Sequence, residues 1–152
     1  MLQIRQATVN DVPILLPLVA EYWAFEGIVG FDSPQVSAHL TRLLAEPRLG
    51  CAWIAFADGM PIGYLLAVYV FSLEHLGLTA EIDEFFVIPQ RRGHSVGLQL
   101  LRIAEAVFVH AGCTNVSLQL SRRNDSARAF YRRQGYTERS GYELLDKMLR
   151  DG

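Results

Sequence analysis

The stretch that decides the architecture of this chain is AEIDEFFVIPQRRGHSVGLQLLRIAEAVFVH, residues Ala80–His110. It opens with an apolar-rich run, Ala80 to Ile88, which indicates a strand; Pro89 ends it, because proline has no amide for a sheet ladder. A glycine-bearing turn follows, and apolar spacing then predicts a long helix from about Ser95 to His110. This order of strand, turn and helix leaves free backbone amides at the start of the helix.

The turn, QRRGHSVG at Gln90–Gly97, has the features of an anion-binding loop. Glycine lets a backbone approach a ligand closely, and the amides and dipole at a helix start favour negative charge. Arg91 and Arg92 add positive charge. No Gly-Lys-Ser/Thr follows, which excludes a Walker loop, and the first glycine of a dinucleotide fingerprint is missing. On pattern alone, an ordinary turn that starts a helix explains these residues equally well.

Upstream of this stretch, hydrophobic periodicity predicts one strand, two helices and a hairpin. The first strand is expected at Leu2–Gln6. The first helix follows Asn10 and ends in the stretch Ala20–Gly27, and the second runs from Ser33 to about Ala45. The two strands of the hairpin are expected at Cys51–Ala57 and Ile62–Phe71. Asn10 is the expected N-cap of the first helix, because its side-chain oxygen can accept an amide of the first turn. Asp58-Gly59 is typical of a two-residue hairpin turn.

Downstream, the pattern predicts three more strands and one more helix. The ranges are strands at Asn115–Leu120, Tyr136–Glu138 and Tyr142–Leu149, and a helix from Asn124 to about Gln134. The complete order is β-αα-βββ-α-β-α-β-β, which indicates a mixed α/β (α+β) fold with helices on the faces of one sheet.

Composition is that of a soluble globular protein. The chain has 152 residues, which fit one domain spanning 1–152; 51% are hydrophobic, 20% are charged, and the net charge is −2. This charge gives no general attraction to nucleic acid or to an anionic membrane. Cys51 and Cys113 lack metal-ligand spacing, so we expect small thiols and no metal site. The N-terminus has no secretory apolar region, and no apolar run reaches the roughly 18 residues of a membrane span, so we expect a cytoplasmic protein.

Two segments of the sequence carry a resemblance to a known family. Arg92-Gly93-His94-Ser95-Val96-Gly97, between a strand and a helix, resembles the Arg/Gln-x-x-Gly-x-Gly/Ala signature of the GNAT superfamily of N-acetyltransferases. Asn124 to Tyr136 resembles the family segment Asn-x-x-Ala-x-x-x-Tyr-x-x-x-Gly-Phe/Tyr. Ser95 departs from the pattern, because the family usually has its first signature glycine there; a positive φ would be strained for serine. Asp83 to Val87 also resembles the core strand of spermidine/spermine-type (diamine) acetyltransferases.

The resemblance implies a mixed, largely antiparallel central sheet, acetyl-CoA as the acetyl donor, and a homodimer. The residues that it implies for the coenzyme are Phe86 and Val87 through their backbone, Arg92, Gly93, His94, Ser95, Val96, Gly97, Asn124 and Tyr131. It also implies that Tyr131 is the general acid for the departing thiolate. Without the motif, Tyr131 would be a core aromatic residue, Asn124 a plain N-cap and His94 an exposed loop residue.

Acetyl transfer to an amine needs a base that removes a proton from the ammonium group. The resemblance implies Asp83 as the first candidate, because it aligns with the glutamate that has this role in the polyamine-type enzymes; Glu84 is the second candidate and Glu81 the third. Strand alternation would place Glu81 and Asp83 on one face and Glu84 on the other. A solvated strand end, or an ion pair with a nearby arginine, is the alternative explanation of these carboxylates.

Acidic and aromatic residues gather in the elements expected to receive the acceptor amine. The candidates are Glu21, Tyr22, Trp23, Glu26 and Glu81, which can attract a cation or pack on its aliphatic part. For Trp23, packing of the first helix against the sheet is an equally good explanation as contact with the acceptor. We therefore predict an N-acetyltransferase that acts by direct attack of a primary amine of a small cationic substrate: a polyamine, a diamine or an amino acid. The alternatives are a peptide or protein N-acetyltransferase, a non-catalytic acyl-CoA-binding module and an unrelated nucleotide-binding α/β protein.

Overall fold

The structure, a computed structural model, describes residues 1–150. The strands are β1 (Leu2–Gln6), β2 (Gly50–Ala57), β3 (Met60–Ser72), β4 (Gly77–Val87) and β5 (Val116–Leu118). The helices are α1 (Val12–Glu26), α2 (Ser33–Ala45), α3 (Val96–His110) and α4 (Asp125–Arg133), with short 3₁₀ turns at Val9–Asp11 and Pro89–Arg91. The chain forms two compact units, Met1–Gln119 and a smaller one that begins at Leu120.

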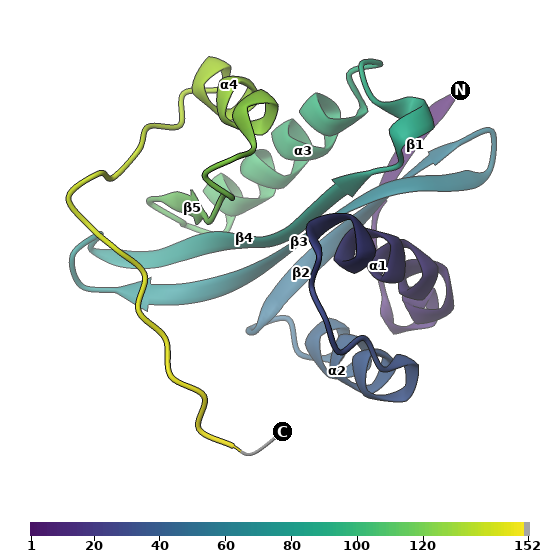
Figure 1. The fold of residues 1–152 in the computed structure, drawn as a ribbon, viewed down its shortest axis with the longest axis horizontal. Helices are drawn as coiled ribbons and strands as arrows, with labels where there is room; N and C mark the ends of the chain where they lie inside the picture. Colours follow the sequence, from purple (N-terminus) through teal and green to yellow (C-terminus); the bar gives the residue numbers. More distant parts are fainter. Residues whose placement is uncertain (151–152) are drawn as a thin grey trace. The chain divides into compact units, whose positions relative to one another are not determined.

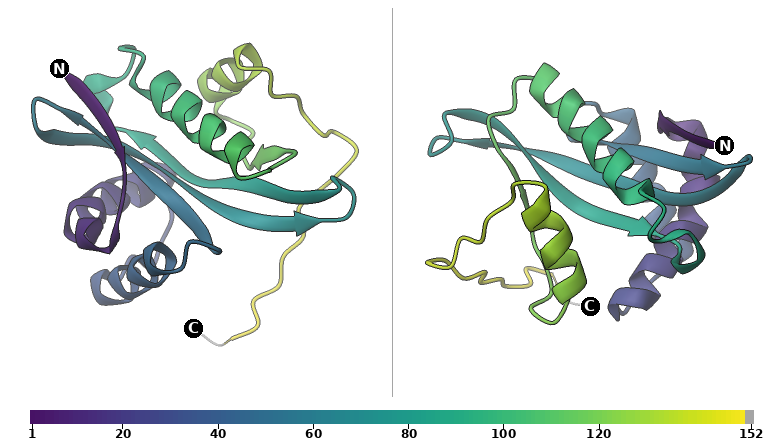
Figure 2. Two further views of the ribbon diagram at one scale, coloured as in Figure 1. Left: turned by 180° about the vertical axis from the view of Figure 1, so that it is seen from behind. Right: turned by 90° about the horizontal axis from the view of Figure 1, so that it is seen from above.

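The larger unit is built on one sheet with the strand order β1-β2-β3-β4-β5. The first four strands pair antiparallel in sequence order, and β5 pairs parallel to β4. Helices α1 and α2 cover one face of this sheet and α3 covers the other, as Figure 1 and both views of Figure 2 show. The predicted mixed, largely antiparallel sheet with helices on its faces is therefore confirmed.

Each face of the sheet has its own apolar core. On the α1 and α2 side, the buried strand residues are Ala52, Ile54, Tyr64, Leu66 and Phe86. On the α3 side, Trp53 packs its ring on Phe108 of α3, with 5.7 Å between the ring centroids, and both side chains are fully buried. The two cores hold β3 and β4 between helices, so the middle of the sheet fixes the positions of the candidate site residues on β4.

The hairpin between β2 and β3 has the turn that its sequence predicts. Ala57 pairs with Met60, so the loop has two residues, and Asp58 and Gly59 have φ values of 51° and 80°. Positive φ at both central residues is the type I′ geometry, whose twist matches that of the flanking strands. The Asp-Gly prediction is confirmed.

The start of the first helix differs from its prediction. Asn10 lies inside the 3₁₀ turn, whose N-cap is Thr8, and Asp11 holds the N-cap position of α1 without a side-chain bond to an α1 amide. The Asp11 carboxylate instead accepts the Thr8 amide at 2.8 Å and the two terminal nitrogens of the Arg5 guanidinium at 2.8 Å each. Asp11 is only 5% exposed, and these three donors satisfy it. A carboxylate that meets a bidentate arginine forms a stronger contact than a neutral asparagine can, which favours Asp11 over Asn10 at the junction between the 3₁₀ turn and α1.

Acid should therefore destabilise this protein partly through Asp11. The hydrogen bonds from Arg5 lower the pKa of its carboxyl from 3.8 to about 2, so the contact stabilises the fold above pH 3.8 and is lost as the pH falls towards 2. We expect the free energy of unfolding to fall by about 1 to 2 kcal/mol in this window. Urea unfolding from pH 7 to pH 2 measures it, and Asp11→Asn should flatten the profile.

The matched control for this prediction is Asp58→Asn. Asp58 also forms an ion pair, with the N-terminal ammonium group, but both side chains are largely exposed at 77% and 80%. Solvent screens such pairs, so little change is expected. An Asp11→Asn profile parallel to that of the wild type would contradict the assignment.

The two closing strands predicted at Tyr136–Glu138 and Tyr142–Leu149 are wrong. Residues 136–150 contain no strand, and Leu145 and Leu149 are 87% and 90% exposed. A strand needs a neighbour for its amides and carbonyls. The pattern also places apolar residues next to each other, at Leu144-Leu145 and Met148-Leu149, where a half-buried strand needs strict alternation.

None of the helices described within residues 1–150 is long and apolar enough to cross a lipid bilayer.

Candidate active site

Strand β4 contains a bulge at Asp83. Its register pairs Ile82 with Ala67 and Glu84 with Leu66 of β3, so Asp83 is an extra residue without a partner. A bulge bends its strand and changes the direction of the side chains that follow. The acidic pair of the sequence therefore lies at the one irregular point in the pairing of β3 with β4.

The bulge overturns the predicted arrangement of the three carboxylates. Glu81 lies opposite Val68 and Glu84 opposite Leu66, and both partners belong to the core on the α1 and α2 side. Glu81 and Glu84 therefore share a face, which strict alternation did not predict. One inserted residue shifts the parity of the strand, so every side chain beyond it moves to the other face.

Both oxygens of the Glu84 carboxylate are occupied. The Tyr64 hydroxyl donates to Oε1 and the Trp23 indole N–H donates to Oε2, each at 2.8 Å. The Asp83 side chain, in contrast, makes no hydrogen bond or ion pair with any residue from 1 to 150. Each Glu84 oxygen thus accepts one hydrogen bond and keeps a second lone pair, whereas both Asp83 oxygens are without a donor.

The electrostatics of the site show that its carboxylates gather around Tyr22. Burial raises the pKa of Tyr22 to about 12, and the charges of Glu26, Glu84 and Asp83 contribute to that rise. Burial also raises the pKa of Asp83, although the residue is exposed as a whole. The pKa of Glu84 is raised mainly by burial, while the hydrogen bonds from Tyr64 and Trp23 partly offset the rise. The cluster can accept a proton and attract a cation.

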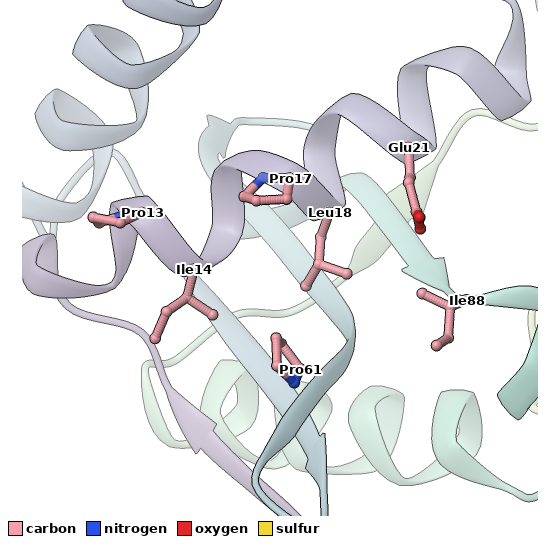
Figure 3. A pocket seen from close by; sticks show the side chains of 7 residues that line it. All are labelled: Pro13, Ile14, Pro17, Leu18, Glu21, Pro61 and Ile88. Atoms are coloured by element: carbon pink, nitrogen blue, oxygen red, sulfur yellow. The ribbon is translucent and has the colours of Figure 1, made fainter.

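The remaining acceptor candidates lie in different places. Glu26 is exposed and close enough to influence Tyr22. Trp23 staples α1 to β4 through Glu84, and its ring meets that of Phe31 edge-on. Glu21 instead lines a groove of about 330 Å³ beneath α1 (Figure 3). The lining residues are Pro13, Ile14, Pro17, Leu18, Glu21, Pro61 and Ile88.

Beyond the bulge, β4 has one unpaired edge. β4 pairs with β3 from Gly77 to Val87, but with β5 only from Ala80 to Ile82. No strand among residues 1–119 pairs with Asp83–Val87 on the β5 side. Backbone groups on such an edge can pair with an extended ligand.

The turn after β4 has the left-handed backbone that the sequence predicts at Gly93 and Ser95. Gly93 and Ser95 have φ values of 81° and 60°. The first backbone bond at the start of α3 runs from the Gln99 amide to the Ser95 carbonyl at 3.0 Å. The amides of Val96, Gly97 and Leu98 therefore have no intrahelical acceptor and are available to an anion. A diphosphate fits this donor set.

Packing within the protein does not explain why position 97 is a glycine. A Cβ atom added there would meet the Phe85 ring at 3.6 Å, an ordinary van der Waals contact. Glycine in a helix is about 1 kcal/mol less favourable than alanine. No contact among residues 1–150 therefore requires glycine here, and the coenzyme role expected for Gly97 stays a prediction.

The Arg92 side chain is engaged within the larger unit. Its Nε donates to the Val87 carbonyl at 2.8 Å, and its guanidinium lies 4.5 Å from the Phe25 ring and 5.5 Å from the Phe86 ring. Arg92 thus ties the turn to β4 and α1. His94 is exposed, and its Nδ1 lies 3.1 Å from the Arg92 carbonyl. The coenzyme roles expected for both residues stay predictions.

Ser95 is the strained residue that the sequence indicated, which leads to a stability prediction. A residue with a Cβ atom in the left-handed region is disfavoured by roughly 1 to 2 kcal/mol. Ser95→Gly should remove this strain and lose only a 3.2 Å hydrogen bond from Gln99, so Tm should rise by a few degrees. Ser117→Gly, at an exposed strand position, should lower Tm instead. Thermal unfolding of both variants tests the strain, and a lower Tm for Ser95→Gly would contradict it.

The smaller unit carries the second signature on α4. Asn124 caps this helix, as predicted: its Oδ1 accepts the Ala127 amide at 3.1 Å. Tyr131 is half-buried, and its ring packs edge-on against Phe130 and Tyr136, with centroids 5.3 Å and 5.5 Å away. The predicted helix and its cap are therefore confirmed, and the coenzyme roles of Asn124 and Tyr131 stay predictions.

Sequence reasoning missed Tyr64. It lies in an apolar run, and nothing in its neighbours marks it as polar in function. The one available signal is chemical: a hydroxyl on a buried strand must find a partner, and the candidates are few. The structure supplies that partner as Glu84.

Relatives of this chain are N-acetyltransferases. It is 28% identical over 136 residues to the aminoalkylphosphonate N-acetyltransferase of Salmonella typhimurium, covering 90% of this chain and 85% of that protein. It is 23% identical over 148 residues to the aminoglycoside N(6')-acetyltransferase type 1 of Klebsiella aerogenes, covering 96% of each.

Solved structures share the fold. An integron cassette protein from the mobile metagenome of the Cole Harbour salt marsh superposes with a TM-score of 0.87 at 28% identity, over 99% of this chain and 92% of that one. The aminoglycoside N-acetyltransferase AAC(6')-Iy, solved in complex with CoA, superposes with a TM-score of 0.83 at 19% identity, over 99% of this chain and 96% of that one.

The acetyltransferase (GNAT) family pattern matches residues 16–136, from within α1 to the tyrosine that ends the second signature. Because this match covers most of the chain, the family is settled: this protein belongs to the acetyltransferase (GNAT) family.

Proposed function

We propose that this N-acetyltransferase moves the acetyl group of acetyl-CoA to a primary amine of a small cationic substrate, a polyamine, diamine or amino acid, by direct attack of the amine. The observation that carries the proposal is the acidic cluster at the β4 bulge. Asp83, Glu84 and Glu26 lie near Tyr22, and no lysine or arginine pairs with these three carboxylates within residues 1–150. Uncompensated negative charge in a partly desolvated place attracts a cation.

Asp83 is the proposed base. A base must have a free lone pair and a pKa nearer to the working pH than an ordinary aspartate has. Asp83 meets both conditions, since it has no hydrogen-bond donor among residues 1–150 and burial raises its pKa. Glu84 meets these two conditions less well, because each of its oxygens already accepts a hydrogen bond, one from Tyr64 and one from Trp23. Glu81, the third candidate, lies farther along the strand, opposite Val68.

The coenzyme site rests on the turn and on the open edge of β4. The amides at Val96, Gly97 and Leu98 suit a diphosphate. The edge of β4 beyond Ile82, which β5 does not cover, suits a pantetheine arm, and Phe86 and Val87 are proposed for it, although the Val87 carbonyl already accepts a hydrogen bond from Arg92. Tyr131, placed by the second signature, is the proposed acid that protonates the departing thiolate, and Asn124 is proposed for the pantetheine arm. We keep the homodimer and the cytoplasmic compartment as proposals on family likeness and composition.

The negative charge of the carboxylates around Tyr22 favours acceptors that carry positive charge. By their names, the two relatives act on an aminoalkylphosphonate and on an aminoglycoside. A phosphonate is an anion, and the carboxylates around Tyr22 would repel it. A small amine with a second positive charge suits the same carboxylates.

The test is a thiol-release screen with acetyl-CoA over polyamines, diamines, amino acids, an aminoalkylphosphonate and short peptides, paired with Tm measured with and without acetyl-CoA. We expect a higher Tm with the coenzyme, because it binds the native state, and fastest turnover with di- and polyamines. Turnover with peptides alone would support the peptide N-acetyltransferase alternative. A shift in Tm without any turnover would support a non-catalytic acyl-CoA-binding module.

A further inference from the structure

The Glu84 carboxylate is held by residues from two other elements. Trp23 comes from α1 and Tyr64 from β3, and each donates one hydrogen bond of 2.8 Å to a different oxygen. Tyr64 is completely buried, and its partner across the pairing with β4 is Phe86. A carboxylate with one donor on each oxygen has a single orientation, so Glu84 is fixed while Asp83 beside it is not.

Both donors also favour the charged form of Glu84. A neutral phenol and an indole N–H stabilise a carboxylate more than a carboxylic acid, because the acid would have to give up an acceptor oxygen. Burial raises the pKa of Tyr64 far above its ordinary value, so its hydroxyl stays a donor throughout the working pH range. The contact therefore opposes the effect that burial has on Glu84.

The other charged and titratable groups around Glu84 do not replace these donors. From α1, Tyr22 lies near enough to feel the charge of Glu84, and Glu26 adds negative charge. From β4, Asp83 adds a second negative charge, which disfavours ionised Glu84. From the turn, the Arg92 guanidinium lies on the Phe86 ring but bonds to the Val87 carbonyl. The two hydrogen bonds are thus the stabilising contacts to the charge of Glu84 among residues 1–150.

We propose that Tyr64 and Trp23 are positioning residues for acceptor recognition: they hold the Glu84 carboxylate charged and in one orientation, so that it binds the acceptor ammonium and leaves Asp83 free to take a proton. This inference rests on the proposed function, since it concerns the same amine. It assigns the two neighbouring carboxylates different tasks, which their sequence does not distinguish. A residue that merely filled space at position 64 would have no influence on the pH dependence of acceptor binding.

Tyr64→Phe is the decisive variant, because it removes one hydroxyl and keeps the buried ring. Loss of a donor disfavours the ionised form, so the pKa of Glu84 rises, and the acidic limb of kcat/KM should move up by about one pH unit. The acceptor KM should rise about tenfold at pH 6 and much less at pH 8.5. The KM for acetyl-CoA and the kcat at pH 8.5 should stay within twofold or so of the wild type.

The matched control is Tyr69→Phe. Tyr69 lies on the same strand, but it packs on Phe108 on the α3 side, and within residues 1–150 its hydroxyl contacts only the Cys51 thiol, at 3.5 Å. This variant should keep the wild-type pH profile. Trp23→Phe removes the other donor and should shift the acidic limb in the same direction as Tyr64→Phe, so it decides the matter if Tyr64→Phe does not fold.

An unchanged pH profile and an unchanged acceptor KM in the folded variants would overturn the inference, whatever happens to Tm, and would leave Tyr64 and Trp23 as packing residues. This failure differs from failure of the proposed function. In the first case the wild type still acetylates small amines; in the second the wild type itself releases no thiol with any of them.

Discussion

Asp83→Asn is expected to lower kcat by about 10² to 10³-fold, the usual contribution of a general base. Asparagine keeps the size of the side chain at the bulge but accepts no proton at neutral pH. The loss should be largest at low pH, where nearly all of the amine is protonated, and should shrink as solvent deprotonates the amine at high pH. Steady-state kinetics from pH 6 to pH 9.5 with the best acceptor measure both features.

Two further variants make this result specific. Glu84→Gln should raise the acceptor KM more than it lowers kcat. Tyr64 and Trp23 hold the Glu84 carboxylate, and its proposed task is to bind the acceptor ammonium rather than to take its proton. Glu46→Gln removes an exposed carboxylate after α2, paired only loosely with Arg42 at 3.8 Å, and should behave as the wild type does. A loss in Asp83→Asn that is the same at every pH, with a larger loss in kcat for Glu84→Gln, would transfer the role of base to Glu84.

Tyr131→Phe is the second large effect that we expect, a fall in kcat of about 10². The phenol is the proposed proton donor to the thiolate, and phenylalanine keeps the ring that packs on Phe130 and Tyr136. Affinity for acetyl-CoA should change little, because only a hydroxyl is lost. Single-turnover kinetics together with coenzyme binding by calorimetry separate the chemical step from binding.

Tyr136→Phe is the control for that variant. Tyr136 lies in the same unit, its ring packs on Tyr131, and the second signature admits either Phe or Tyr at its position. It should retain nearly full turnover. Equal kcat values for Tyr131→Phe and the wild type would remove the assigned acid and leave a solvent molecule as the proton source.

The features predicted from sequence alone are those whose cause lies within a few residues. Asp58-Gly59 forms its I′ turn because the two residues themselves tolerate positive φ. Asn124 caps α4 through an amide three residues away. Ser95 is strained because the turn requires a left-handed residue there, whatever surrounds it.

The features that the sequence did not predict depend on residues far apart along the chain. Glu84 meets Trp23 and Tyr64, which lie 61 and 20 positions away. The bulge at Asp83 is a property of the register between β3 and β4, and no pattern within β4 reveals it. Glu21 resembled the other acidic residues of α1 and β4, yet it lines a separate groove. The two closing strands failed for the same reason, because a strand exists only with a partner.

The sequence by itself determined the family, the left-handed turn before α3 and the residue types of the candidate site, because signature spacing and turn chemistry act locally. The tertiary structure decided which carboxylate is free and which is held. This difference arises from one inserted residue and two hydrogen bonds. The pairing of β3 with β4 brings Tyr64 to Glu84, and the packing of α1 on the sheet brings Trp23 to it, each at 2.8 Å.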